Sequence, residues 1–437
     1  MTGPASPATD AVLAAVRDIR GESRALQLYL EICARCGTCA QVCHVYQGRR
    51  SRRANPARRS DHLRSLYKLA NSPLRRALRR VRFSDAERDT WAREFYECSG
   101  CRRCARFCPL GIDNSVITRK ARAILHSLGK SPKKIAETQR ISDRYGNDEG
   151  QPVPAFFESI RFLEEEMLEE SGIPVKIPVD QPTDYLFVPA SADLLSYPDT
   201  LMGCAYFFHA AGLSWSMSSR SFDSANFGLF SGDDEHMKRK ARMMVDSCVA
   251  LGAKTLVIGE CGHATRVAKR FLPTFWGNLP FEIKSIFTVA CEALDAGKLR
   301  LDPFRNVVRV TYHDPCNTAR SCGLVEEPRR LLAACVTDFR EMTPTRHENW
   351  CCGGGGGLAV MDGKEGLREM DCTFLEFRMN VAGKMKLEQI RATGAGYVAT
   401  ACANCKRQLT QLMEYHGTGV EVGGVFDLFA KAVVLAP

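Results

Sequence analysis

The distribution of apolar positions divides the chain into two parts. From about residue 183 onward, short β-branched runs at 185–188, 254–258, 307–312 and 397–399 alternate with helical patterns such as 235–251 and 382–393. This alternation predicts α/β units with parallel strands. The earlier residues carry helical patterns, and the Pro- and Gly-containing stretch 146–182 is expected to be a linker with one amphipathic helix near 156–170.

The C-terminal half contains an internal repeat. Residues 250–261 and 392–402 both show the end of a helix, a glycine turn, a strand and a cysteine, and 185–191 and 310–316 are each a strand running into a loop. We interpret residues 183–304 and 305–437 as two duplicated, Rossmann-like α/β lobes.

Composition is that of an ordinary globular protein. The chain has 437 residues, of which 45% are hydrophobic and 25% charged, so there is room for two or three domains. The longest apolar runs, 254–259 and 433–435, are far shorter than the roughly 20 residues that span a bilayer. Residues 1–10 lack the pattern of a signal peptide, so we expect any membrane anchor to come from a partner.

Twenty cysteines dominate the composition. Without an export signal, and with the spacings described below, they are expected to be metal thiolates in a reducing cytoplasm rather than disulfides.

The net charge of +10 is moderate and partly concentrated in two arginine patches. Such patches are usually solvated helical faces, and they lack the interleaved aromatics of a nucleic-acid site, so no nucleic-acid partner is expected. They are better placed to stabilise anionic clusters and to steer an acidic redox partner. The patches are Arg49, Arg50, Arg52, Arg53, Arg58 and Arg59, and Arg75, Arg76, Arg79, Arg80 and Arg82.

Two runs follow the spacing C-x2-C-x2-C-x3-C. They are Cys33, Cys36, Cys39 and Cys43, and Cys98, Cys101, Cys104 and Cys108. Three cysteines of such a run wrap one [4Fe-4S] cube, and in two-cluster proteins the fourth ligates the other cluster. We therefore predict one cluster on Cys33, Cys36, Cys39 and Cys108, and a second on Cys98, Cys101, Cys104 and Cys43.

Two features depart from the common ferredoxin pattern. His44 stands where a proline usually follows the fourth cysteine, and 54 residues separate the two runs. The long spacer resembles the α-helical ferredoxin domain of heterodisulfide reductase C subunits and succinate dehydrogenase iron–sulfur subunits. The resemblance implies an α-helical dicluster domain over residues 23–145, after an N-terminal tail at 1–22.

A third cysteine set lies near the C-terminus. Cys316 is followed by the pair Cys351-Cys352, a run of glycines at 353–357, and then Cys402-x2-Cys405. Glycines let backbone approach a cluster closely and offer N–H groups to it. Cys402 and Cys405 taken alone could also bind zinc, but five cysteines do not suit a four-coordinate zinc site.

This pattern resembles the cysteine-rich CCG domain of heterodisulfide reductase catalytic subunits. The resemblance implies a noncubane [4Fe-4S] cluster on Cys316, Cys351, Cys352, Cys402 and Cys405. Over nearly the whole chain the layout resembles the D-type subunits of heterodisulfide reductase and the DsrK and TmcB components of transmembrane respiratory complexes. The 49 residues between Cys352 and Cys402 exceed the usual family gap of about 35, with the surplus expected around 361–377.

The first lobe has a degenerate version of the set. By the repeat, Ser224-Ala225 replace the cysteine pair and Ala264 replaces the last cysteine, which leaves Cys261. We expect no cluster there. Cys261 and His263 are candidates to face the second lobe's cluster as a thiol and a proton donor, with His313 an alternative donor, whereas an inert cysteine beside a surface histidine is the simpler interpretation. The remaining cysteines, 204, 248, 291, 322, 335 and 372, are expected to be mostly small core residues.

Three functions suit these motifs. The first is an electron-transfer subunit, attached peripherally to the cytoplasmic membrane, that works with a cytochrome b-type or quinone-reactive partner. The second is a catalytic thiol–disulfide oxidoreductase, for which a small disulfide-carrying protein is a candidate partner. The third is the iron–sulfur subunit of a flavin-dependent glycolate or lactate oxidase, with the flavin on a partner, because this chain has no G-x-G-x-x-G fingerprint.

Overall fold

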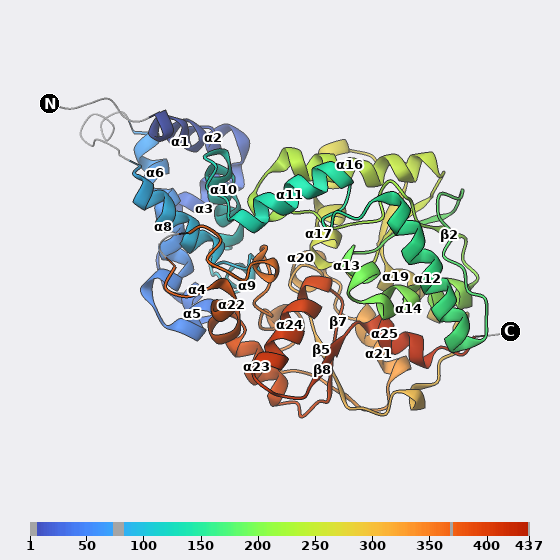
Figure 1. Ribbon diagram of the computed structural model, residues 1–437. Coiled ribbons are helices and arrows are strands. Elements are labelled where there is room, and N and C mark those ends of the chain that lie inside the picture. Colours follow the sequence, from blue (N-terminus) through green and yellow to red (C-terminus); the bar gives the residue numbers. More distant parts are fainter. Residues whose placement is uncertain (1–6, 73–82, 368–369, 436–437) are drawn as a thin grey trace. The chain divides into compact units, whose positions relative to one another are not determined.

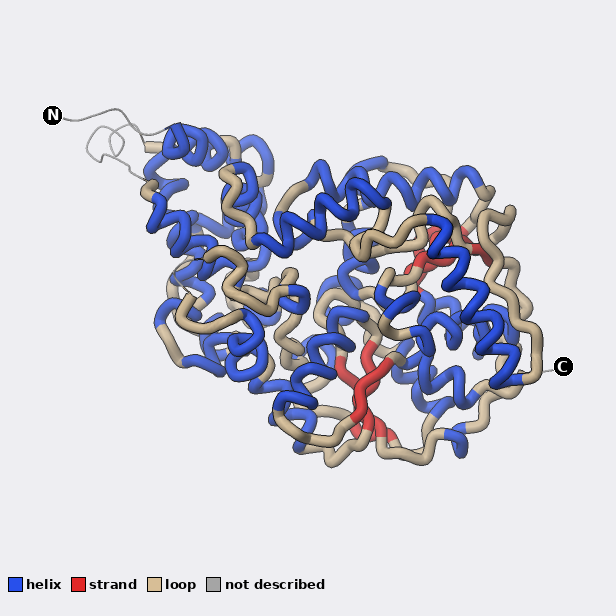
Figure 2. Tube along the Cα trace, viewed as in Figure 1, coloured by secondary structure: helices blue, strands red, loops and turns tan. Residues whose placement is uncertain are grey.

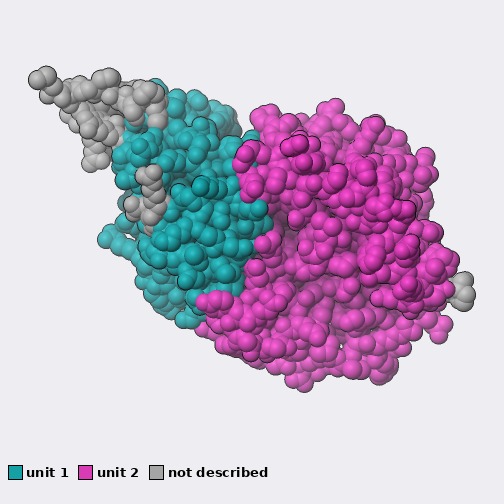
Figure 3. Space-filling model, viewed as in Figure 1, with its two compact units in different colours: residues 1–136, 228–233, 353–385 teal, residues 137–227, 234–352, 386–437 magenta. Residues whose placement is uncertain are grey.

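The computed structural model describes residues 7–72, 83–367 and 370–435 (Figure 1). The second arginine patch, at residues 75–82, therefore lies outside the described residues. The chain divides into two compact units, coloured separately in Figure 3. Unit 1 comprises Met1–Ala136, Gly228–Asp233 and Gly353–Met385, and unit 2 comprises Glu137–Phe227, Asp234–Cys352 and Lys386–Pro437.

The described residues of unit 1 form helices and loops, without a strand. Several of its helices begin at residues suited to the N-cap, because Ser23, Asn55, Ser84 and Asp113 each accept a hydrogen bond from a backbone N–H of the first turn. The helices are α1 (Pro7–Arg17), α2 (Ile19–Glu22), α3 (Arg24–Glu31), α4 (Thr38–Gln41), α5 (His44–Arg49), α6 (Pro56–Ala70), α8 (Asp85–Tyr96), α9 (Arg103–Arg106), α10 (Asn114–Ser127), α15 (Gly228–Ser231) and α22 (Phe374–Phe377).

Unit 2 contains two four-stranded sheets, drawn in red in Figure 2. One has the order β2-β1-β3-β4 and the other β6-β5-β7-β8, and every pairing in both is parallel. The strands are β1 (Tyr185–Val188), β2 (Trp215–Ser216), β3 (Thr255–Ile258), β4 (Glu282–Ser285), β5 (Val310–His313), β6 (Phe339–Arg340), β7 (Tyr397–Thr400) and β8 (Glu421–Gly423). Two parallel sheets with one shared order agree with the predicted pair of α/β lobes.

Helices surround these sheets. They are α12 (Val153–Ser171), α13 (Ala192–Leu195), α14 (Pro198–Ala211), α16 (Asp234–Ala250), α17 (Gly262–Arg270), α18 (Leu272–Trp276), α19 (Ile286–Asp295), α20 (Ala319–Cys322), α21 (Glu327–Cys335), α24 (Ala403–Tyr415) and α25 (Val425–Ala432). Two more, α11 (Lys133–Tyr145) and α23 (Lys384–Arg391), include residues of both units. Within the described ranges, no helix combines the length and the apolar character that crossing a membrane would require.

The helices α14 and α25 join the two lobes of unit 2. A Cβ atom on Gly203 of α14 would lie 2.1 Å from the carbonyl oxygen of Phe426 in α25, so only glycine permits this approach. Phe207 packs edge-on against both Phe426 and Phe429 at the same contact. The lobes therefore share one hydrophobic core.

Candidate metal centres

Cys33, Cys36 and Cys39 line one cavity of unit 1 together with Cys108, the last cysteine of the other run. Cys108 follows the short helix α9 and so reaches the loop that precedes α4. The predicted first set of four thiols is thus brought together around one space.

Cys43 lies with the second run. Burial raises the pKa of the Cys104 thiol well above its ordinary value, and the neighbouring thiols of Cys43 and Cys98 raise it further. Cys43 occupies the N-cap of α5, and Cys101 is buried in the same unit. Cys108 therefore shares a cavity with the three leading cysteines of the first run, and Cys43 lies near Cys98 and Cys104 of the second.

The two cysteine loops have matching backbones. In each loop the residues on either side of the middle cysteine have positive φ, namely Arg35 and Gly37 around Cys36, and Gly100 and Arg102 around Cys101. Left-handed residues on both sides make the loop turn tightly at its middle cysteine.

Arg59 supports an anionic group at the second set. Its side chain is buried, and its Nε and Nη2 atoms have no hydrogen-bond partner among the described residues. Burial opposes its charge, but the nearby thiols of Cys98 and Cys43 and the carboxylates of Glu97 and Glu94 together outweigh that effect and raise the pKa of Arg59. A buried cation with unused N–H donors beside thiol ligands fits an anionic cysteinyl cluster.

The segment that follows Cys352 packs on the second cysteine loop, within unit 1. A Cβ atom on Gly355 would lie 2.6 Å from the carbonyl oxygen of Ser99, and one on Gly356 would lie 2.8 Å from that of Cys98. The buried Arg122 donates to the carbonyl oxygens of Cys98, at 2.6 Å, and Gly356, at 2.8 Å. The glycine run is therefore a close-packed element and not a loose loop.

His44 forms hydrogen bonds to the second cysteine loop and to the segment that follows the glycine run. Its ring is buried, with Nδ1 2.8 Å from the carbonyl oxygen of Ala382 and Nε2 2.8 Å from the hydroxyl of Ser99. A carbonyl oxygen only accepts, so Nδ1 carries the proton and Nε2 accepts from Ser99. Proline could make neither bond, which gives the unusual residue at this position a structural role that the motif did not indicate.

The C-terminal cysteines lie in unit 2 where the central strands end. Cys316 follows β5, and Cys402 follows β7, the adjacent parallel strand. Cys402 is the N-cap of α24, and Cys405 lies in its first turn. The Sγ atoms of Cys352 and Cys405 are 3.4 Å apart, and a hydrogen bond from the Cys405 thiol lowers the pKa of Cys402 to about 7. All five cysteines are buried.

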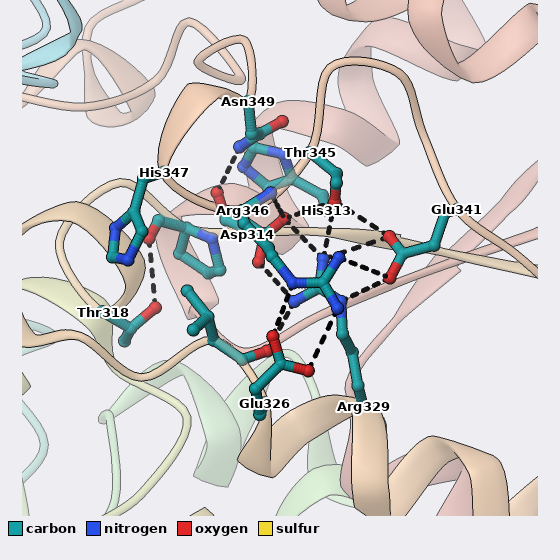
Figure 4. A network of polar contacts seen from close by, with 12 residues as sticks. His313, Asp314, Thr318, Glu326, Arg329, Glu341, Thr345, Arg346, His347 and Asn349 are labelled. Atoms are coloured by element: carbon teal, nitrogen blue, oxygen red, sulfur yellow. Dashed lines mark hydrogen bonds and ion pairs between the residues drawn. The ribbon is translucent and has the colours of Figure 1, made fainter. Parts of the chain in front are cut away.

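An ion-pair network fixes two of these loops (Figure 4). The buried carboxylate of Asp314 accepts from Arg329 at both oxygens and from the backbone N–H of Arg346. Asn349 donates to the carbonyl oxygen of Asp314 at 2.5 Å. The loop carrying Cys316 is thus tied to the segment just before the adjacent cysteine pair.

A buried lysine completes the support. Lys386 donates to Asn349 and Gln389, and burial lowers its pKa to about 7. Sequence reasoning missed Lys386, Asp314 and Arg329, because no local pattern distinguishes them from surface charges.

The first lobe repeats the local geometry with fewer cysteines. Cys261 caps α17 as Cys402 caps α24, and Ala264 takes the place of Cys405 in the first turn. Burial, and then the neighbouring Cys402, raise the pKa of the Cys261 thiol well above its ordinary value. A Cβ atom on Gly262 would lie 3.2 Å from the Sγ of Cys402. Cys261 therefore lies beside the cysteines of the second lobe.

His263 is buried, so the simpler expectation of a surface histidine is wrong. Its Nε2 accepts from the backbone N–H of Asn226 at 3.1 Å, and its Nδ1 is 3.5 Å from the Sγ of Cys261 and 3.2 Å from Nδ2 of Asn404. Burial lowers the pKa of His263 to about 4, so its imidazole is neutral at pH 7.

His313 lies at the end of β5 with its ring fully buried. Burial lowers the pKa of His313 well below its ordinary value. Neither ring nitrogen has a hydrogen-bond partner among the described residues. Its ring nitrogen and the Sγ atoms of Cys352 and Cys405 lie within 4.8 Å of one another.

The donor sets fit iron–sulfur clusters. None of the twenty cysteines forms a disulfide, so all thirteen thiols of the three predicted sets are available as ligands. Of the other seven, Cys204, Cys248, Cys261, Cys291 and Cys335 are buried, as expected of core residues, and Cys322 and Cys372 are partly buried.

Comparison with known proteins identifies two domains. A 4Fe-4S dicluster domain matches residues 29–112, and a CCG cysteine-rich domain matches residues 310–410. The chain is 28% identical to Hdr-like menaquinol oxidoreductase iron-sulfur subunit 2 of Archaeoglobus fulgidus, over 97% of this chain and 83% of that relative. It is 22% identical to the D-type subunit of dihydromethanophenazine:CoB--CoM heterodisulfide reductase from Methanosarcina barkeri, over 93% of this chain and 95% of that relative. Over nearly its whole length the chain is therefore similar to iron–sulfur subunits of heterodisulfide reductase and of Hdr-like menaquinol oxidoreductase.

A shorter match agrees with this assignment. The chain is 29% identical to the B-type subunit of fumarate reductase (CoM/CoB) from Methanothermobacter marburgensis, over 42% of this chain and 33% of that relative. The chain is an oxidoreductase component that carries two [4Fe-4S] clusters in its dicluster domain and a further, noncubane cluster in its CCG domain.

Proposed function

We propose that this chain relays electrons between a quinone- or cytochrome-bearing membrane partner and its C-terminal CCG site. Each cluster, when bound, would accept and pass on one electron at a time. The single observation that carries the proposal is that one chain contains three cysteine ligand sets, thirteen cysteines in all, with every thiol free. We further propose that the chain attaches to the cytoplasmic face of the membrane through its partner.

The first cysteine set is the proposed point of electron exchange with that partner. Cys36 is exposed, as are Arg35 and Leu110 at the rim of the same cavity. Arg35 is paired with Asp61 at 3.1 Å, so the exposed thiol and the apolar side chain of Leu110 would make the transient docking contact with a redox partner. In the second set, by contrast, all four cysteines are buried or partly buried.

Burial of the C-terminal cysteines favours relay over direct attack on a large disulfide substrate. All five are at most 6% exposed. Their backbone is held by the Asp314–Arg329 network, so opening the site would separate a buried ion pair.

A second candidate function is thiol–disulfide reduction at the same site. The observation favouring it is the buried pair Cys261 and His263 beside Cys402. In that case His263, which is neutral at pH 7, would take up a proton together with the incoming electrons and give it to the leaving thiolate. General acids of this kind contribute about 10²- to 10⁴-fold in rate.

The deciding experiment uses the full chain purified anaerobically, with iron counted and EPR spectra recorded. We expect about twelve irons, four for each cluster, and about eight in Cys352→Ser. Membranes that contain the native partner, reduced with menadiol, should transfer electrons to the wild-type chain, whereas menadiol alone should reduce it far more slowly. Equal reduction with and without membranes would contradict the relay.

The two candidate functions predict different effects of replacing His263. A relay predicts that His263→Gln leaves electron transfer from the membranes nearly unchanged. If the site is catalytic, His263→Gln should keep all its iron but reduce a small disulfide about 10²- to 10⁴-fold more slowly. Full disulfide reduction by Cys352→Ser would rule out both.

A further inference from the structure

His313 is a buried polar group whose partner the protein does not supply. Its side chain is 1% exposed, and neither Nδ1 nor Nε2 has a hydrogen-bond partner among the described residues. A neutral imidazole has one donor and one acceptor, and leaving both unused in a dry interior costs about 1–3 kcal/mol for each. Such a group points to a partner other than the polypeptide.

The surroundings of the ring identify the kind of partner. Its nitrogen and the Sγ atoms of Cys352 and Cys405 all lie within 4.8 Å of one another, and the two sulfurs are 3.4 Å apart. Both cysteines belong to the five-cysteine set. Three donors at this spacing can share one metal ion or two adjacent irons.

The backbone holds the ring in this place. The carbonyl oxygen of His313 accepts from the hydroxyl of Thr400 at 3.2 Å, and β5 pairs with β7 at this residue. The next residue, Asp314, is fixed by Arg329 and Asn349. His313 therefore cannot turn away from the cysteines without disturbing the central strand pair.

We propose that His313 is a nitrogen ligand to an iron of the C-terminal cluster, in addition to the cysteines. Imidazole is a common iron ligand, and histidine in place of cysteine raises the reduction potential of an iron–sulfur centre. The inference rests on the presence of that cluster and holds whether the site relays electrons or reduces a disulfide. The ligating nitrogen then has no proton to give, so any role of His313 as a proton donor would be left to its other ring nitrogen.

The test is a nitrogen coupling in the EPR signal of the C-terminal cluster. Full-length protein carrying ¹⁵N-histidine, purified anaerobically, should show in pulsed EPR a ¹⁵N coupling of the size of a directly bound nitrogen. The coupling should disappear in His313→Gln and persist in His347→Gln, a matched control in the same segment as Asn349. Absence of such a coupling in the wild type, or its persistence in His313→Gln, would overturn the proposal.

A second variant guards against loss of the whole site. His313→Cys restores an iron ligand, so it should keep about twelve irons and the signals of the other two clusters. Its C-terminal cluster should lack the nitrogen coupling and have a lower midpoint potential, because a thiolate replaces a neutral donor. An unchanged potential in a fully loaded His313→Cys protein would also overturn the proposal. A count of about eight irons in the wild type would instead show that the C-terminal cluster is absent.

Discussion

Arg329 binds both carboxylate oxygens of Asp314, each at 2.8 Å, and both side chains are buried. Asp314 lies between His313 and Cys316 in sequence, and its carboxylate also anchors the backbone of Arg346. The arrangement therefore converts a loop at the end of β5 into a rigid support for the C-terminal cysteines.

Replacing Arg329 with lysine tests this support. Lysine cannot bind both oxygens at once, and breaking a buried pair typically costs about 3–5 kcal/mol. We expect Arg329→Lys to lower the free energy of unfolding by an amount of that order and to lose iron from the C-terminal site alone. The adjacent Arg330→Lys is the control, because Arg330 pairs with Asp295 at the exposed surface. Equal effects of the two changes would contradict the role of the pair.

The grouping of the ferredoxin cysteines predicts matched phenotypes. Cys43→Ser and Cys98→Ser should remove the same component of the reduced EPR spectrum, and Cys33→Ser and Cys108→Ser should remove the other. If Cys43→Ser instead gave the spectrum of Cys33→Ser, the crossed grouping would be wrong.

Arg59 should raise the potential of the second ferredoxin cluster. A buried cation beside Cys43 and Cys98 favours the more negative, reduced state. Arg59→Met should therefore lower that midpoint potential by on the order of 60 mV, a tenfold change in a one-electron equilibrium. Redox titration followed by EPR measures the shift, and Arg58→Met, at the exposed neighbouring position, should leave it unchanged.

Gly355 is expected to tolerate no side chain. A methyl group there would overlap the carbonyl oxygen of Ser99, and overpacking of this kind costs about 1–3 kcal/mol. Gly355→Ala should destabilise unit 1 by that amount and disturb the EPR signal of the Cys98 cluster. Gly363→Ala is the matched control, because the nearest atom to its Cβ would be 3.7 Å away. Stability curves that coincide for the two variants would refute the close packing.

Glu260 should make stability depend on pH. Burial raises its pKa to about 8, whereas an unfolded glutamate has a pKa of about 4.3. Between these values the folded state holds a proton that the unfolded state releases, so the free energy of unfolding falls as pH rises. Glu260→Gln cannot ionise and should flatten that decline over pH 5–8 in denaturant titrations. Glu421→Gln, at an exposed position on β8, should leave the slope unchanged.

The strands recognised in the sequence are the central ones. The runs at 185–188, 254–258, 307–312 and 397–399 correspond to β1, β3, β5 and β7, which lie inside their sheets. Central strands are covered on both faces and so read as continuous apolar runs. The edge strands β2, β6 and β8 have only two or three residues, too few to show a pattern, and β4 is as long as the central strands but mixes charged, polar and apolar residues.

The sequence by itself determined the chemistry of this protein. The cysteine spacings specified the two cubane motifs, and the third cysteine set gave the resemblance to the CCG domain, because ligand spacing along a tight loop is a local property. Only the tertiary structure decided what surrounds those ligands. The contacts of His313, Arg59 and Arg329 join residues distant in the chain, and their burial depends on packing that no local pattern encodes.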